Sequence, residues 1–279
     1  MRNITKPTLR MSEVVSDCIQ NLSNENLKQD IIDSLTLFDD AEDDFEEKKK
    51  ANNLFQIVRN VVISNTINAQ VLKDIYTDRM VNKKNTGRTH YNSILMSAPS
   101  GRCPLCGQRI ATTLDHYLPK ADYPILATSP INLIPACTDC NKGKLSNYPT
   151  AQNEETLHPY YDDVDQENWL KMELKGCSPM IFNFYTNPPV NWSNLLQVRA
   201  KYHFDSFKLN DLYISHAAEE FENVKKQLTK LFNKGGEELL KEHLLDSLES
   251  RLEINLNSWQ SAFYSGLLTD QDFCSGLFI

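Results

Sequence analysis

The chain has 279 residues, of which 41% are hydrophobic and 24% are charged. These are the proportions of an ordinary globular protein of one or two domains with a substantial core, and its apolar runs are too short to cross a bilayer. No apolar segment follows the N-terminal residues, so we expect no signal peptide, and the cytoplasm is the default location.

Charge is distributed unevenly along the chain. The formal net charge of −8 is the wrong sign for a protein that holds DNA alone, because phosphate binding needs clustered lysine and arginine. Seven carboxylates fall in residues 39–47, here called the acidic run, whereas residues 101–148 hold five basic and three acidic residues. We expect the acidic run to be the solvated face of a helix; a docking surface for a basic partner is the alternative.

The N-terminal region is predicted to be helical, because apolar residues recur at helical spacing from residue 12 to about 80. Within it, residues 40–60 are expected to form one long helix, whose acidic start suits the positive end of the helix dipole. The polar residues 82–102 then lead into a cysteine-rich centre.

The centre contains four of the seven cysteines, in two CxxC pairs, Cys103/Cys106 and Cys137/Cys140. Each CxxC forms a tight turn that points two thiolates at one ion, and two such turns complete the tetrahedral sulfur site of structural zinc. The gap between the pairs is 30 residues, longer than the roughly 15–20 of a plain zinc finger. We expect a hairpin to fill the gap; two unrelated pairs in the core are the alternative.

An aspartate and a histidine, Asp115 and His116, lie side by side in this gap. Phosphodiester hydrolysis needs a base, a divalent cation and a group that orients the base. A histidine beside an aspartate at a strand end offers a base and a metal ligand, provided that a turn or bulge lets their side chains converge. A hard cation such as Mg²⁺ prefers oxygen ligands, which Asp115 and the side chain of Asn141 supply.

Residues 145–193 are rich in proline and are expected to form loops or short strands. Helical periodicity returns from residue 205 to about 268, with Gly235-Gly236 separating two helices. The sequence therefore predicts a mainly α protein with a small α+β centre. Its expected parts are a helical region 1–100, the centre 101–165, and a loop-rich, then helical region 166–279.

Three short runs in the centre resemble the HNH endonuclease motif, also called ββα-metal or His-Me finger. They are Asp115-His116-Tyr-Leu-Pro, Asn132-Leu-Ile-Pro and Cys140-Asn141-Lys-Gly-Lys144, and the resemblance covers roughly residues 101–148. It implies a β-hairpin followed by a helix, flanked here by N- and C-terminal helical segments.

The resemblance also implies roles for individual residues. His116 would be the general base, and Asn132 would fix the loop and orient the base. Asn141 takes the third motif place, which many members fill with histidine; the asparagine version is similar to the Cas9 HNH domain, where that residue and the aspartate before the base bind the metal. Lys144 matches the lysine that follows on the helix.

A wider resemblance links the chain to the PtuB HNH subunit of Septu and retron-associated anti-phage systems. It rests on residues 114–120, Tyr123-Pro124, residues 132–137, residues 157–162 and the helical flanks. It implies an ABC-type or SMC-like ATPase partner (PtuA-like). Such a partner would account for the negative net charge of this chain, because the partner could supply the DNA-binding surface.

Four side chains are weighed against simpler interpretations. His158 is a candidate second metal ligand or phosphate contact, with a packed or exposed histidine as the alternative. Lys120 and Lys144 are candidate phosphate contacts, as is Lys142, with a solvated surface as the alternative.

We therefore expect an endonuclease with structural Zn²⁺ and catalytic Mg²⁺ or Mn²⁺, acting in an anti-phage defence complex. Its substrate is expected to be DNA on family resemblance only, because the centre acts on the phosphate and reads no bases. The alternatives are an RNA- or tRNA-cleaving effector, and a zinc-stabilised nucleic-acid or protein binding module without chemistry.

Overall fold

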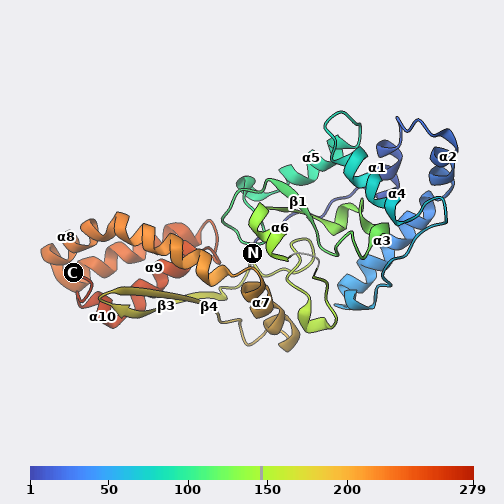
Figure 1. Ribbon diagram of the computed structural model, residues 1–279. Helices are drawn as coiled ribbons and strands as arrows, with labels where there is room; N and C mark the ends of the chain where they lie inside the picture. The colour runs from blue at the N-terminus through green and yellow to red at the C-terminus, as the bar shows by residue number, and fades with distance from the viewer. Residues whose placement is uncertain (145–146) are drawn as a thin grey trace. The chain divides into compact units, whose positions relative to one another are not determined.

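The computed structural model describes residues 1–144 and 147–279, which divide into two compact units, Met1–Asp163 and Val164–Ile279. Helices predominate in both, and small antiparallel sheets accompany them (Figure 1). This confirms the predicted mainly α fold with a small α+β centre. No helix among the described residues is both long and apolar enough to span a membrane.

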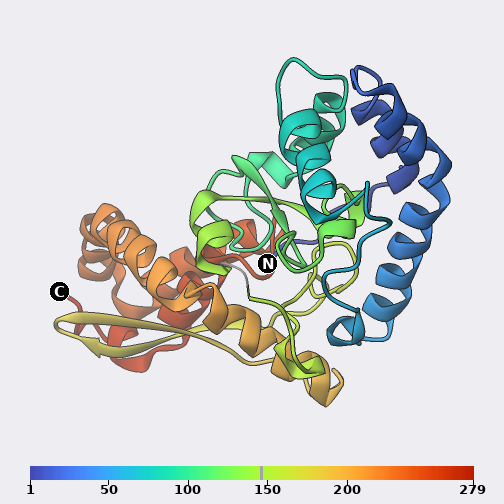
Figure 2. The same ribbon diagram turned by 45° about the vertical axis from the view of Figure 1, so that its right-hand side comes forward.

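The first unit is built mainly from helices around a compact core. The helices are α1 (Met11–Cys18), α2 (Glu25–Asp33), α3 (Leu35–Lys50), α4 (Ala69–Asp74), α5 (Arg88–Met96) and α6 (Thr138–Lys144), with a π-helical turn η2 (Ile75–Met80) directly after α4. Asn24 and Asn68 cap the starts of α2 and α4, where a side-chain oxygen satisfies free N–H groups. Figure 2 shows α1 beside the long helix α3, and the two pack together.

The single helix expected over residues 40–60 is wrong at both ends. Helix α3 begins at Leu35 and stops at Lys50, because Asn52 takes the left-handed conformation, with φ of 54°. An asparagine in that conformation is a common way to end a helix. Beyond it, the Leu54 N–H donates to the Glu155 carboxylate at 2.7 Å instead of continuing the helix.

The acidic run lies on α3, and part of it binds the chain's own N-terminal segment. The Asp39 carboxylate accepts hydrogen bonds from the backbone and hydroxyl of Ser12 at 3.0 and 2.8 Å. Buried Glu42 accepts from the Met11 N–H at 3.0 Å and from the Ser129 hydroxyl at 2.8 Å. The expectation of a solvated face is therefore wrong for Asp39 and Glu42, which tie three segments together.

A small ββα unit lies within the first unit. Strands β1 (Thr113–His116) and β2 (Leu133–Ala136) pair antiparallel, with Thr113 opposite Ala136 and His116 opposite Leu133. Helix α6 follows β2 and packs against β1 (Figure 1). The hairpin expected between the cysteine pairs and the helix expected after the hairpin are therefore present.

The second unit combines a hairpin with helices. Strands β3 (Leu170–Cys177) and β4 (Met180–Thr186) form the hairpin, and the helices are α7 (Asn194–Ser206), α8 (Leu209–Leu252), α9 (Trp259–Thr269) and α10 (Gln271–Cys274). Helix α9 packs on β3 and α8 packs on β4 (Figure 1). Gly236, with φ of 65°, breaks α8 internally, as the Gly235-Gly236 pair predicts.

Candidate active site

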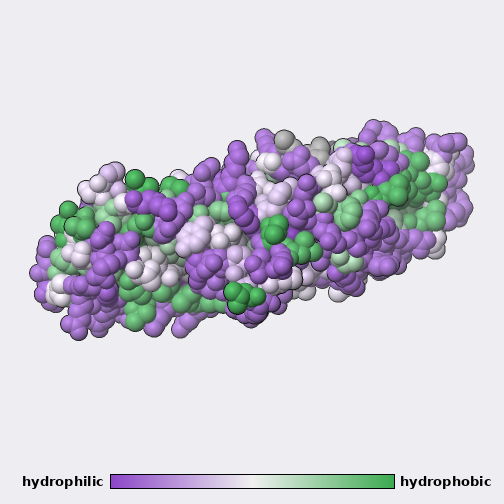
Figure 3. All heavy atoms as spheres, turned by 90° about the horizontal axis from the view of Figure 1, so that it is seen from below, coloured by the Kyte–Doolittle hydropathy of each residue, from purple (hydrophilic) through white to green (hydrophobic). Residues whose placement is uncertain are grey.

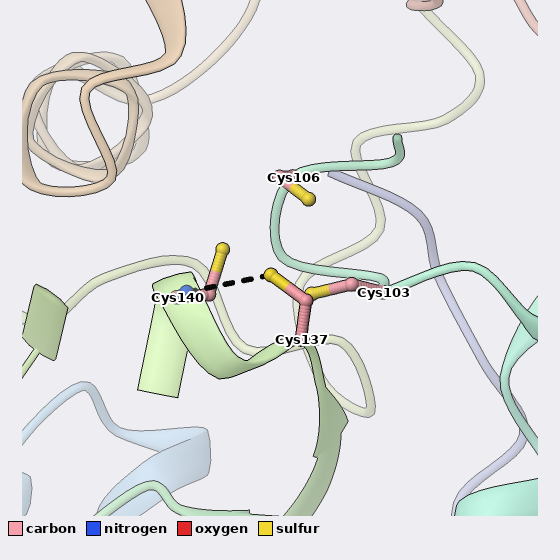
Figure 4. A group of neighbouring side chains, drawn as sticks. All are labelled: Cys103, Cys106, Cys137 and Cys140. Carbon is pink, nitrogen blue, oxygen red and sulfur yellow. Dashed lines mark hydrogen bonds between the residues drawn. The ribbon is translucent and has the colours of Figure 1, made fainter. Parts of the chain in front are cut away.

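The four CxxC cysteines form one cluster. Their sulfur atoms all lie within 4.8 Å of one another, and all four residues are buried. Figure 4 shows the side chains converging from the loop after α5 and from the start of α6, with the Cys140 N–H donating to the Cys137 sulfur at 3.4 Å. The alternative of two unrelated pairs is therefore wrong.

Local backbone geometry shapes the cluster for a metal. Gly107, with φ of 66°, closes the first turn through a hydrogen bond to the Cys103 carbonyl at 2.7 Å. Hydrogen bonds from the Cys103 thiol lower the pKa of Cys106, and that of Cys137 to about 6. The hydrogen bonds within the cluster raise the pKa of the other two thiols, Cys103 and Cys140. Four cysteine thiols in one closed, buried group fit a structural Zn²⁺ ion.

His116 lies at the end of β1 and is only 9% exposed. Its Nε2 atom lies 2.9 Å from the Ala127 carbonyl oxygen. Because a carbonyl oxygen only accepts, Nε2 carries the proton, and Nδ1 is the basic nitrogen of the neutral ring. Burial lowers the pKa of His116 to about 3, so the ring is neutral near pH 7.

Asn132 is completely buried and holds the loop between the two strands. Its Oδ1 atom accepts from the Leu118 N–H at 2.7 Å, and its Nδ2 atom donates to the Leu118 and Leu126 carbonyls at 3.0 and 3.1 Å. Leu126 directly precedes Ala127, whose carbonyl binds His116. One amide side chain thus fixes the segment that orients the imidazole.

Asp115 is buried beside Lys144 of α6. The Lys144 ammonium lies 3.1 Å from Asp115 Oδ2 and also donates to the His116 carbonyl. Burial raises the pKa of Asp115 and lowers that of Lys144, and their mutual attraction opposes both shifts. Helix α6, which contains Cys140, is therefore tied to the strand that carries His116.

Asn141 lies on α6, half-buried, and its backbone N–H donates to the Cys137 carbonyl at 3.1 Å. Within residues 1–144 and 147–279, no hydrogen bond joins its side chain to Asp115. The structure thus bonds Lys144 to Asp115 and to the His116 backbone, and it connects Asn132 to the His116 ring only through the loop that contains Ala127. It places Asn141 on helix α6.

The remaining candidates differ in their surroundings. Lys120 is partly exposed and donates to the Thr77 hydroxyl at 3.1 Å. His158 is fully buried among aromatic rings, the nearest being Tyr117 with a centroid distance of 4.4 Å, and its Nδ1 atom accepts from the Tyr160 N–H. His158 therefore matches the packed alternative, because it cannot reach a phosphate at the surface.

Two residues at the site escape prediction from the motif. The Ala127 carbonyl is a backbone group, and side-chain identity gives no signal for it. Tyr76 of η2 lies edge-to-face against the His116 ring, with centroids 4.5 Å apart, yet it is 40 residues away in the sequence. Only the apolar periodicity of the N-terminal region indicates that Tyr76 is buried.

The zinc-compatible cluster, the hairpin and the helix define the class of this centre. Residues 103–146 match the family model of the HNH endonuclease, and this segment is an HNH domain. Over 298 aligned residues the chain is 26% identical to Protein ea31 of Escherichia phage lambda, covering 99% of this chain and 100% of that protein. No solved structure matches the chain significantly.

Proposed function

We propose that the chain is a metal-dependent endonuclease that hydrolyses phosphodiester bonds of DNA at its HNH domain. The observation that carries the proposal is the buried His116 ring. Burial favours the neutral ring, the Nε2–H bond to the Ala127 carbonyl fixes its tautomer, and buried Asp115 precedes it on the strand. A neutral imidazole with its Nδ1 atom free of the proton is the form that can act as a base on water.

The donor set near His116 fits a hard divalent cation. The Asp115 carboxylate and the Asn141 amide oxygen are the ligand types that Mg²⁺ and Mn²⁺ prefer. When bound, the ion would supply Lewis-acid polarisation of the scissile phosphate and stabilise the leaving oxygen.

The chain's own residues carry the remaining roles. His116 accepts the proton of the attacking water at Nδ1, and Asn132 keeps the ring oriented by fixing the loop that contains Ala127. Lys144 and Lys120 contribute positive charge near the phosphate, Lys144 from its place beside Asp115.

A metal series tests the proposal. Purified protein is incubated with plasmid DNA, and separately with structured RNA, in Mg²⁺, Mn²⁺, Ca²⁺ or Zn²⁺. The proposal is supported if the wild-type protein cleaves DNA in Mg²⁺ or Mn²⁺ and the Asp115→Asn variant does not. Cleavage of RNA alone would favour the RNA-cleaving alternative, and binding without cleavage of either would favour the zinc-stabilised binding module.

We further propose that this nuclease works as a subunit of an anti-phage defence complex with an ABC-type or SMC-like ATPase. The support is the resemblance of residues 114–120, 123–124, 132–137 and 157–162 and of the helical flanks to the Septu subunit. The net charge of −8 adds to it, because such a charge leaves DNA binding to a partner. Co-purification from the native operon context, followed by nuclease assays with and without ATP, tests this. A protein that purifies alone and cuts constitutively would contradict it.

A further inference from the structure

The π-helical turn η2 lies outside the HNH domain yet reaches its centre. The Val81 N–H donates to the Tyr76 carbonyl at 2.9 Å, a spacing of five residues that marks a π-turn. Such turns are uncommon and often occur at functional sites. One extra residue in a helical turn changes the direction of the preceding side chains by about 100°, so the turn decides where Tyr76 points.

We propose that Tyr76 is a positioning residue for His116, so that the N-terminal helical region completes the nuclease centre. The inference rests on the proposed function and deepens it. The Tyr76 and His116 rings meet edge-to-face, with centroids 4.5 Å apart and an interplanar angle of 69°, which is a favourable aromatic geometry. Tyr76 is only 6% exposed, so packing restricts its own ring.

The contact with Tyr76 adds a restraint that the Ala127 hydrogen bond lacks. A single hydrogen bond at Nε2 fixes one point of the imidazole but leaves the ring free to rotate about that bond. A buried ring against the imidazole removes this freedom. The direction of the Nδ1 lone pair is thereby set, and base catalysis depends on that direction.

The same turn also places a charge. The Lys120 ammonium lies 4.8 Å from the centroid of the Tyr76 ring, in a cation–π contact, and it donates to the Thr77 hydroxyl at 3.1 Å. Two neighbouring residues of η2 thus contact the site: Tyr76 packs against His116, and Thr77 binds Lys120. We expect loss of Tyr76 to disturb both.

The kinetic test compares Tyr76→Leu, Tyr76→Phe and a matched control, Tyr91→Leu. Tyr91 is also 6% exposed and also lies under a cation, Arg88, and its hydroxyl donates to Thr113 at the start of β1. Among the residues that the structure describes, the only ring in aromatic contact with His116 is that of Tyr76. Tyr76→Leu should lower kcat by about 10²-fold, because misplacing a catalytic group costs that much, with little change in KM. Tyr76→Phe should retain most of the rate, since the edge contact needs the ring and not the hydroxyl. Equal losses in Tyr76→Leu and Tyr91→Leu would overturn the inference.

A second measurement is independent of nuclease activity. In zinc-loaded wild-type protein, nuclear Overhauser cross-peaks should connect the ring protons of Tyr76 and His116. In Tyr76→Leu, the ring-nitrogen signals of His116 should shift or broaden. Absence of the cross-peaks in the wild type overturns the inference even if the leucine variant fails to fold. If the wild type cleaves nothing, the proposed function fails, and this spectrum still decides whether Tyr76 restrains the ring.

Discussion

At the scale of single residues, Asn132 shows how one side chain organises a site that lies several residues away. Its amide group makes three hydrogen bonds to the backbone at Leu118 and Leu126, all in the buried interior. The backbone groups of a buried loop need partners, because an unpaired one costs free energy. The Asn132 amide supplies these hydrogen-bond partners for the Leu118 and Leu126 backbone, which lies outside both strands.

We predict that Asn132→Ala lowers the free energy of unfolding by about 2–4 kcal/mol, since it leaves buried donors and acceptors unpaired. It should also lower the cleavage rate, because the Ala127 carbonyl that orients His116 loses its support. Urea unfolding and single-turnover cleavage check the two effects.

The matched control is Asn257→Ala in the second unit. Asn257 is also buried and makes the same kind of clamp, accepting from the Trp169 and Leu170 N–H groups and donating to the Val164 and Glu167 carbonyls. This variant should lose stability but keep its cleavage rate. If Asn132→Ala keeps the wild-type rate as well, Asn132 has no role in orienting the base.

The motif residues could be predicted from sequence because their chemistry depends on side-chain type and short spacing. The two CxxC pairs, Asp115-His116 and Asn132 belong to that group. Tyr76 and the Ala127 carbonyl could not be predicted in this way. Tyr76 contacts His116 from 40 residues away in the sequence, and Ala127 binds His116 through its backbone, so neither contact leaves a spacing pattern. The partner of Asp115 is a middle case: the motif includes Lys144, but only the fold shows the ion pair.

At the scale of elements, helix α3 holds the first unit together through buried charge. The Lys49 ammonium is fully buried and lies 3.3 Å from both the Glu155 and the Asp162 carboxylates. Glu155 also accepts from the Leu54 N–H and Asp162 from the His158 N–H, at 2.7 Å in each case. These bonds tie residues 155–162 to the end of α3.

We predict that Lys49→Met lowers the free energy of unfolding by about 3–5 kcal/mol, because two buried carboxylates lose their cation. Lys50→Met is the control: Lys50 is 65% exposed and pairs with Glu46 at the surface, where an ion pair contributes little. Urea titrations of both variants give the comparison. Equal midpoints for the two variants would show that the buried cluster adds no stability.

Hydrophobic periodicity predicts that these helices exist but not where α3 ends or what its carboxylates bind. The end of α3 depends on Asn52, and the acidic run depends on which segments pack against it. A pattern of charges gives no information about tertiary partners, so Glu42 is expected in solvent and is found buried against Met11 and Ser129.

At the scale of the whole molecule, one face of the surface can be compared with that of an ordinary globular protein. On the face shown in Figure 3, hydrophilic residues predominate and apolar residues form small separate patches. The two units each have their own core, and the four zinc-compatible thiols all belong to the first unit.

We therefore predict that removing the metal affects the first unit selectively. Binding of structural zinc is coupled to folding, so a chelator should reduce hydrogen-exchange protection in β1, β2 and α6. Protection in the β3–β4 hairpin and α9 should remain. Exchange followed by mass spectrometry resolves these segments. Unchanged protection of the HNH domain after complete zinc removal would contradict a structural role for the cluster.

The measurement that tests the central claim most directly is the single-turnover rate of DNA cleavage in Mg²⁺ by wild-type protein and His116→Ala, with zinc content and thermal unfolding recorded for both. His90→Ala is the control, since the His90 imidazole pairs with Asp17 of α1. Loss of the base should lower the rate about 10²–10⁴-fold, with zinc content unchanged and the control at the wild-type rate. Full cleavage by His116→Ala would contradict the account.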